Sequence, residues 1–116
     1  MRLQTAVPSH QQFLPEFADM AAKARQACEL LKALAHEGRL MILCILCEGE
    51  KSVTELEHML ALRQATVSQQ LARLRTEGLV RTRRDGKTVY YSLACEDVRI
   101  IIGAVHEVFG RDDRKG

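Results

Sequence analysis

The chain has 116 residues, of which 47% are hydrophobic and 28% charged, and its formal net charge is +2. This length suits one domain, and no run approaches the roughly 20 apolar residues of a membrane span. Residues 1–15 also lack the long apolar stretch of a signal peptide, so we expect a cytoplasmic protein with no membrane contact, whose four cysteines are reduced.

The first half of the chain is predicted to be helical. Residues 1–15, with two prolines and several polar residues, form the expected flexible N-terminal arm. Apolar residues then recur at steps of three and four over residues 16–35, which predicts an amphipathic helix. The segment Arg39–Cys47 is apolar almost all round, so it predicts a short buried helix.

Two short helices with a tight turn between them follow. Ser52 and Glu55 match a capping box, which predicts the start of the first of these helices. After a turn over residues 61–64, the second runs to about Glu77, and Gly78 suits its C-terminal end. Two such helices form a helix-turn-helix.

The apolar period then changes from 3.6 to 2. Residues 79–84 and 87–93 flank Asp85-Gly86, and Asp-Gly between two strand-like runs is a strong hairpin signal. A last amphipathic helix is predicted over residues 95–109. The order α-α-α-α-β-β-α predicts a mostly helical winged helix-turn-helix fold with a two-stranded wing. The expected organisation is an N-terminal arm (1–15), a winged helix-turn-helix DNA-binding and dimerisation domain (16–110) and a charged tail (111–116).

One segment is strongly basic. From Arg63 to Lys87 there are seven Lys and Arg residues against two acidic ones, so this segment carries +5 and the rest of the chain carries −3. A basic segment on a nearly neutral protein indicates a polyanion as partner. A solvated charged face is the alternative, because charge alone does not distinguish the two.

The second helix of a helix-turn-helix enters the major groove of DNA. Its apolar stripe is predicted at Val67, Leu71 and Leu74, which leaves the opposite face polar. Amides pair well with adenine and arginine with guanine, whereas a carboxylate would repel phosphate. The predicted base-reading residues are Gln64, Thr66, Ser68, Gln69, Gln70 and Arg73. The residues predicted to contact phosphate, at helix starts and on the wing, are Lys51, Ser52, Arg63, Arg83, Arg84 and Lys87.

These stretches also carry a family resemblance. LLKALAHEGRLMILCIL, SQQLARLRTEGLV and RRDGKTVYYSL resemble the ArsR family of winged helix-turn-helix transcriptional repressors, over roughly residues 27–110. The resemblance implies a homodimer, built through the first and last helices, that binds a palindromic operator in double-stranded DNA. The apolar faces of residues 17–34 and 98–109 favour the same dimer, since a lone small domain would leave them partly exposed.

Many members of this family sense metals, but neither of their metal sites is matched here. The helix VTELEHML, where the family carries thiolates, has no cysteine. On the last helix, Asp97 is followed two positions on by Arg99 rather than histidine, and His106-Glu107 are adjacent. We therefore expect no metal site and assign surface or capping roles to His36, His58 and His106.

The closer resemblance is to the thiol-based BigR/SqrR-type branch, which responds to sulfide or oxidants, with a C-terminal end like that of NolR-type nodulation regulators. That branch pairs a cysteine in the second helix with one near the end of the last helix. Cys44 holds the first position, but Gly110 stands at the second, so the same bridge cannot form. Three alternatives stay open: Cys44 acts with Cys47, Cys44 acts with Cys28, or there is no thiol switch and each cysteine is a small buried hydrophobic residue. The thiol-sensing candidates are thus Cys44, Cys28 and Cys47, with a reactive sulfur species or an oxidant as effector.

Two other classes of function compete with a DNA-binding repressor. Winged helices also serve as protein-interaction modules, although the arginines of the wing argue against that use here. The sequence has no Gly-rich phosphate loop and no evident Ser/His/Asp set, so we expect neither an enzyme nor a cofactor.

Overall fold

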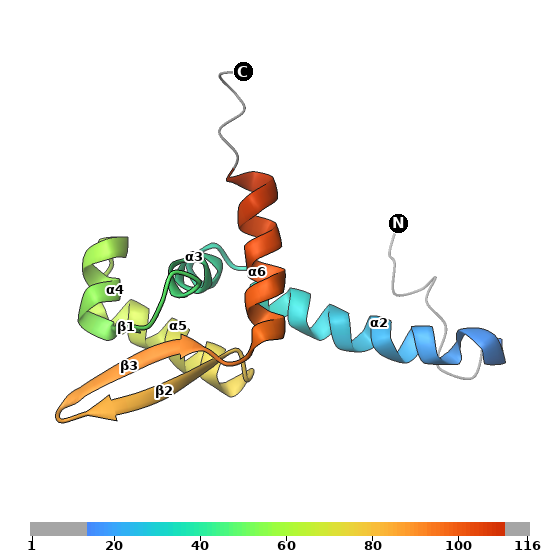
Figure 1. The fold of residues 1–116 in the computed structure, drawn as a ribbon, viewed down its shortest axis with the longest axis horizontal. Helices are drawn as coiled ribbons and strands as arrows, with labels where there is room; N and C mark the ends of the chain where they lie inside the picture. Colours follow the sequence, from blue (N-terminus) through green and yellow to red (C-terminus); the bar gives the residue numbers. More distant parts are fainter. Residues whose placement is uncertain (1–13, 111–116) are drawn as a thin grey trace, which may run out of the picture. The chain divides into compact units, whose positions relative to one another are not determined.

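A computed structural model describes residues 14–110 of the chain (Figure 1). The predicted tail, residues 111–116, and all but the last two residues of the predicted arm lie outside the described residues. The structure consists of two compact units that meet in the sequence between Lys32 and Ala33.

The first unit contains most of helix α2 (Pro15–Leu34). Proline suits the first helical position because its missing N–H needs no partner there and its φ is already helical. The predicted start at Glu16 is therefore one residue late. Large apolar side chains of this helix are exposed: Phe17 by 44%, Met20 by 62% and Leu31 by 57%.

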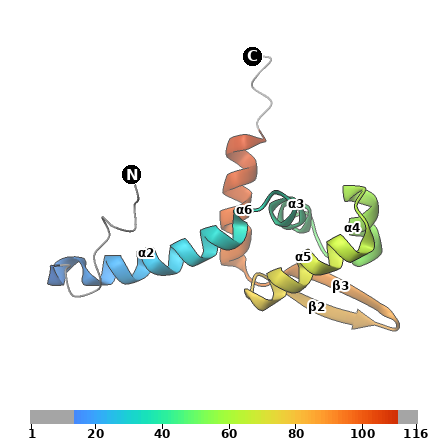
Figure 2. The same cartoon turned by 180° about the vertical axis from the view of Figure 1, so that it is seen from behind.

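The second unit contains four helices and a small sheet. In chain order its elements are α3 (Glu37–Leu46), β1 (Lys51–Ser52), α4 (Val53–Leu60), α5 (Gln64–Thr76), β2 (Val80–Asp85), β3 (Thr88–Leu93) and α6 (Glu96–Phe109). The predicted winged helix-turn-helix order is confirmed. Figures 1 and 2 show the β2–β3 hairpin projecting from the helices as a wing.

Local capping fixes the ends of these helices. Ser52 caps α4: its Oγ accepts a hydrogen bond from the backbone N–H of Glu55 (3.1 Å), and the Glu55 carboxylate accepts one from the N–H of Ser52 (2.8 Å). This is the predicted capping box. Beyond α5, Gly78 adopts φ +78°, and the N–H of Leu79 donates to the carbonyl of Leu74 (2.9 Å), which closes the helix in a Schellman-type turn.

His36 has the capping role expected for it. Its Nδ1 accepts hydrogen bonds from the backbone N–H groups of Gly38 (3.1 Å) and Arg39 (3.4 Å) at the start of α3. Arg39 in turn donates from Nε to the carbonyl of Ala33 (2.7 Å). These bonds fix the first turn of α3 and the chain that leads into it.

The sheet has one strand more than the sequence predicted. The hairpin turns at Asp85-Gly86 as expected, with Gly86 at φ +66°. In addition, β1 pairs antiparallel with β3, so the order is β1-β3-β2 and β3 is central. A two-residue strand shows no alternation of apolar and polar residues, and it forms only because β3 lies beside it.

One core joins the helices of the second unit. Helix α3 packs against both α5 and α6. The predicted inward stripe of α5 is confirmed, because Val67, Leu71 and Leu74 are each 0% exposed. The other fully buried side chains are Ile42, Leu43 and Leu46 on α3, Leu56 on α4 and Ile102 on α6. With so few aromatic residues, the core is made of branched aliphatic side chains that pack helix against helix.

Candidate nucleic-acid interface

Helices α4 and α5 are joined by residues 61–63, which make a sharp turn. Ala61 ends α4 in the left-handed conformation (φ 56°, ψ 41°), which few residues other than glycine adopt. Its N–H donates to the carbonyl of Glu57. Arg63 then takes an extended conformation and α5 begins at once. The turn directs α5 across the surface with its apolar stripe inward and its polar face outward.

The outer face of α5 contains four of the six predicted base-reading residues. Gln64, Ser68, Gln69 and Arg73 are all exposed. The Arg73 Nε also forms an ion pair with Glu77 one turn further on (3.1 Å). Amide, hydroxyl and guanidinium groups on one helical face are the groups that read base edges in the major groove.

Thr66 and Gln70 lie elsewhere, on the flank of α5. Both are half-buried and line a groove of about 400 Å³ next to the start of α3. His36, Gly38 and Met41 belong to the same groove. The packing of α3 against α5 explains this, because the start of α3 lies beside these two residues. Their role as base readers stays a prediction, with less open surface than the other four have.

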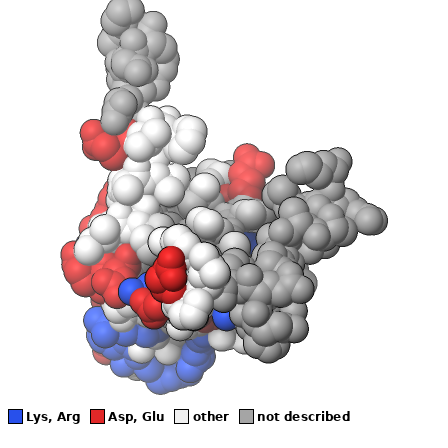
Figure 3. Space-filling model, turned by 90° about the vertical axis from the view of Figure 1, so that its right-hand side faces the viewer, with Lys and Arg blue, Asp and Glu red and all other residues white. Residues whose placement is uncertain are grey.

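The wing presents two cations at its tip. Arg84 on β2 and Lys87 in the turn are exposed, and within residues 14–110 neither forms an ion pair. Cations in such a position are typical contacts for the phosphate backbone. Lys and Arg gather at the lower end of the molecule in Figure 3, the level at which α5 and the hairpin lie in Figure 1.

Arg83 is placed differently from Arg84. Its Nη2 lies 2.7 Å from Oε1 of Glu50, and its Nε lies 3.0 Å from Oε2, so the guanidinium binds the carboxylate through two hydrogen bonds. The guanidinium also lies over the ring of Tyr90, 4.7 Å from its centroid. The hydrogen bond from Arg83 lowers the pKa of Glu50 below its ordinary value, and the same bond raises the pKa of Arg83.

The remaining predicted phosphate contacts stand at helix starts. Arg63 is exposed at the N-terminus of α5. Lys51 is half-buried in β1, where its Nζ lies 3.5 Å from the carbonyl oxygen of Glu50. Ser52 is buried and its hydroxyl is engaged in the capping box, so its side chain is not open to a ligand. Of these three, Arg63 has the most accessible charge.

The cysteines occupy two kinds of place. Cys28 and Cys95 are exposed, whereas Cys44 and Cys47 on and next to α3 are half-buried. Burial raises the pKa of the Cys44 thiol, and the neighbouring Cys47 raises it further. The pKa of Cys47 is also raised, mainly by burial, although the Arg99 guanidinium opposes the shift. Among residues 14–110 no disulfide is present.

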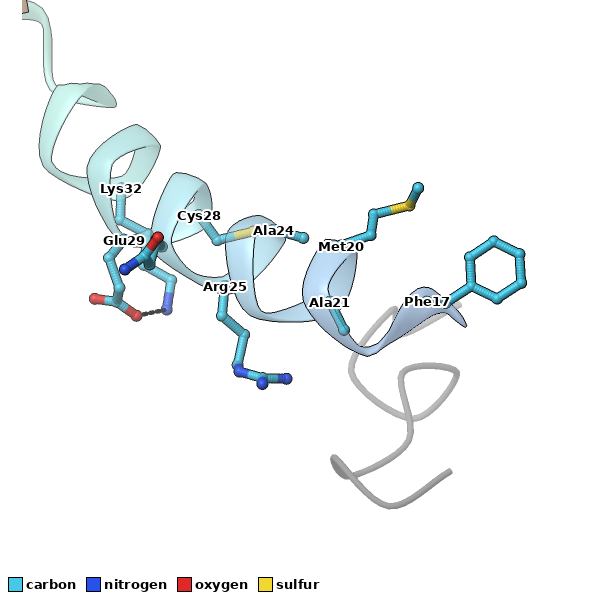
Figure 4. Close-up of a pocket in the computed structure, with 9 residues that line it drawn as sticks. Phe17, Met20, Ala21, Ala24, Arg25, Cys28, Glu29 and Lys32 are labelled. Carbon is cyan, nitrogen blue, oxygen red and sulfur yellow. Dashed lines mark hydrogen bonds and ion pairs between the residues drawn. The ribbon is translucent and has the colours of Figure 1, made fainter. Parts of the chain in front are cut away.

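Helix α2 carries an apolar groove in the first unit. It measures about 880 Å³ and is lined by Phe17, Met20, Ala21, Ala24 and Cys28, among others. Figure 4 shows Arg25 and the Glu29–Lys32 ion pair (3.4 Å) as its polar border. A helix with this much exposed apolar surface is typical of an interaction face.

Within residues 14–110, no three His, Cys, Asp or Glu side chains gather closely enough to hold a metal ion. No helix in the same range has the length and apolar content needed to cross a bilayer.

A buried core shared by four helices, an exposed polar face on the helix after a sharp turn and a basic hairpin together define a winged helix-turn-helix domain. Residues 36–82 match the family model described as "Bacterial regulatory protein, arsR family". The chain belongs to this ArsR family of DNA-binding transcriptional regulators, whose members are not enzymes.

Individual relatives span most of the chain. The transcriptional activator HlyU of Vibrio cholerae is 44% identical over 91 residues, which cover 78% of this chain and 84% of HlyU. The biofilm growth-associated repressor of Agrobacterium fabrum is 47% identical over 90 residues, 78% of this chain and 77% of the repressor.

Solved structures show the same fold. HlyU from Vibrio vulnificus aligns with a TM-score of 0.78 at 46% identity, over 81% of this chain and 98% of that one. The homodimeric winged helix-turn-helix DNA-binding domain of Mb0332 from Mycobacterium bovis aligns with a TM-score of 0.69 at 35% identity, over 80% of this chain and 86% of that one.

Two residues of the site were not found by sequence reasoning. Glu50 and Tyr90 hold Arg83, yet Glu50 is 33 positions away from it in the chain. A glutamate before a two-residue strand has no local pattern that marks it. The contact with Tyr90 could have been predicted, because a hairpin that turns at Asp85-Gly86 places Tyr90 of β3 opposite Arg83 of β2.

Proposed function

We propose that this chain is a transcriptional repressor that binds a palindromic DNA operator as a homodimer. The observation that carries the proposal is the exposed face of α5, where Gln64, Ser68, Gln69 and Arg73 stand together. Arg84 and Lys87 on the wing add cations that suit the backbone of the same duplex. The similarity to the biofilm growth-associated repressor supports repression. The chain is also similar to the transcriptional activator HlyU, so activation is the competing hypothesis.

The homodimer is supported by apolar faces that have no partner within residues 14–110. On α6, Ile100 is 60% exposed, Val108 53% and Phe109 82%, and Phe17 and Met20 are exposed on α2. Burying such side chains against a second copy is favourable by roughly 25 cal/mol per Å². A related winged helix-turn-helix domain is described as homodimeric. Two-fold symmetry in the protein would then match two half-sites about one helical turn of DNA apart.

For the effector, the proposal is that oxidation or persulfidation of Cys44 releases the DNA. Its support is the position of Cys44 on a groove between α3 and α6, with Cys47 three residues further along. A second candidate is a regulator of the same family without a thiol switch. Burial that raises the pKa of Cys44 favours this second candidate, because the thiolate is the reactive form.

The test begins with selection of duplex DNA from a randomised library by the full-length protein. We expect enrichment of an inverted repeat and binding that weakens steeply with salt. For each phosphate contacted, log K should fall by roughly 0.9 per tenfold increase in salt concentration. A scrambled duplex of equal composition is the control. Equal affinity for both duplexes contradicts the proposal and favours a protein-interaction module.

The effector is tested on the same complex. The four thiols are mapped by mass after treatment with polysulfide, peroxide or diamide, and operator affinity is measured for each state. A loss of affinity that disappears in the Cys44→Ser variant supports the thiol switch. Unchanged affinity in every modified state contradicts it and leaves the regulator without a switch.

A further inference from the structure

Arg83, Tyr90 and Glu50 form a connection across the whole sheet. Tyr90 on the central strand β3 is paired with Arg83 on one side and with Ser52 of β1 on the other. Side chains in one such row lie on the same face of a sheet. Glu50 is two residues before Ser52 and therefore continues that face, so the Arg83 side chain passes over the Tyr90 ring to reach it.

The pair ties together two parts of the molecule that the backbone joins only weakly. Glu50 belongs to the segment between α3 and β1, and β1 leads directly through the Ser52 cap into α4. Arg83 lies on β2, an edge strand of the sheet, whereas β1 pairs with β3, and through just two residue pairs. The ion pair therefore anchors β2 directly to the segment that precedes β1.

The pair also leaves Arg83 poorly suited to contact phosphate. Its Nε and Nη2 are both bonded to the carboxylate, and its face is occupied by Tyr90. Moving it to a phosphate would leave the negative charge of Glu50 close to the DNA. Arg84, the next residue, has neither restraint within residues 14–110 and points to the opposite face of the strand.

We propose that Arg83 and Glu50 are positioning residues, which hold the wing at a fixed angle to the helix-turn-helix so that Arg84 and Lys87 meet the DNA backbone, while Arg83 itself contacts no phosphate. This inference rests on the proposed DNA binding. It differs from the sequence-based expectation, in which Arg83 and Arg84 have the same role.

The salt dependence of binding separates the two roles. A lost phosphate contact reduces the slope of log K against log[salt] by roughly 0.9, hence by about 2 for a dimer. A lost positioning contact weakens binding without removing a phosphate contact, so the slope is kept. Removal of Glu50 is the second discriminator. It strengthens binding if Glu50 merely competes with phosphate for Arg83, and it weakens binding if Glu50 positions the wing.

The experiment measures affinity of the full-length protein for its selected duplex at several NaCl concentrations between roughly 50 and 200 mM. The variants are Glu50→Gln, Arg83→Gln, the double variant and the charge swap Glu50→Arg/Arg83→Glu, with Arg84→Gln as the matched control. We expect each single variant of the pair to weaken binding about two- to fivefold, the range of one exposed ion pair, at unchanged slope. The double variant should then bind DNA no more weakly than the weaker-binding single variant, and the charge swap should recover affinity. Arg84→Gln should lower the slope of log K against log[salt].

Three results overturn the inference: a reduced slope in Arg83→Gln, tighter binding in Glu50→Gln, or unchanged affinity in both. Amide hydrogen exchange without DNA gives an independent readout, because Glu50→Gln should accelerate exchange of the hairpin over residues 80–93 while α5 stays protected. Unaltered exchange in the hairpin also counts against the inference. If the wild-type protein selects no duplex, the proposed function fails, whereas the exchange measurement still decides whether the pair positions the wing.

Discussion

Cys44 on α3 and Gly110 at the end of α6 line the same groove, which has a volume of about 350 Å³. Its other lining side chains include Leu40, Ile45, Val105 and Phe109, so the walls are largely apolar. Cys44 thus shares this groove with the position at which the resemblance to the thiol-based branch implies a second cysteine, and that position holds a glycine. The groove brings these two positions together, and the residue at the second one has no sulfur.

The half-buried position of Cys44 predicts slow reaction with alkylating reagents. Burial raises the pKa of its thiol, so less thiolate is present at neutral pH than for an ordinary cysteine of pKa about 8.5. In a time course with iodoacetamide resolved by peptide mass, we expect the exposed Cys95 to be labelled well before Cys44. The Cys44 rate should still increase with pH beyond the range in which an ordinary thiol levels off. A plateau at lower pH would mean that a cation not seen near Cys44 stabilises its thiolate.

Introducing a thiol opposite Cys44 tests the groove geometry. We expect Gly110→Cys to form a disulfide with Cys44 on treatment with diamide, detected by peptide mass under non-reducing conditions. A Cβ at position 110 would lie 2.5 Å from the carbonyl oxygen of His106, so the end of α6 must shift, which we expect to cost about 1 kcal/mol. Gly110→Ala is the matched control, with the same loss of stability and no crosslink. A crosslink to Cys95 in place of Cys44 would show that the two positions are not neighbours.

Residues on the two faces of α5 should respond differently to truncation. Leu71 is 0% exposed, so Leu71→Ala should destabilise the fold by roughly 2–5 kcal/mol. Gln69 is exposed, and Gln69→Ala should leave the thermal midpoint nearly unchanged while it reduces operator affinity by up to about 1–3 kcal/mol, the range of one base contact. Thermal unfolding and duplex binding are measured on both variants. Full operator affinity in Gln69→Ala would remove this residue from the base-reading set.

A charge on the apolar face of α2 should break the proposed dimer. Met20 is 62% exposed and lines the groove of α2, and Met20→Glu would require a buried carboxylate in an interface there. Sedimentation velocity should then show a shift from dimer to monomer, together with loss of cooperative operator binding. Ala22→Glu is the control, because Ala22 is exposed and is not part of the groove lining. Equal dissociation by both variants would point to general destabilisation of the helix.

Protonation of Glu50 should release Arg83 only in acid. The hydrogen bond from Arg83 lowers the pKa of Glu50 in the folded protein, so the pair contributes to stability above the ordinary carboxylate pKa, and this contribution is lost as pH falls through the lowered value. The difference in thermal midpoint between wild type and Glu50→Gln should therefore be constant near neutrality and shrink below about pH 4.5, the unperturbed value. A difference that persists in acid would exclude the charge of Glu50 as its cause.

Elements that depend on near neighbours in the chain could be predicted from the sequence. The Ser52–Glu55 capping box, the Gly78 turn that ends α5, the Asp85-Gly86 hairpin turn and the buried stripe of Val67, Leu71 and Leu74 all arise from residues within a few positions of one another. Such patterns are visible in a single sequence because helical and strand periods are fixed by backbone geometry. They were sufficient to predict the winged helix-turn-helix order.

The roles of residues that meet residues far away in the chain depend on the tertiary structure. Adjacent arginines at 83 and 84 look equivalent in the sequence, but a strand directs them to opposite faces, and only one of those faces meets Glu50. Likewise the sequence pattern predicts that Thr66 and Gln70 face outward with the other polar residues of α5. In the structure α3 packs beside them, and both are half-buried. Both differences arise because a contact between distant segments depends on sheet register and helix packing, which no local pattern records.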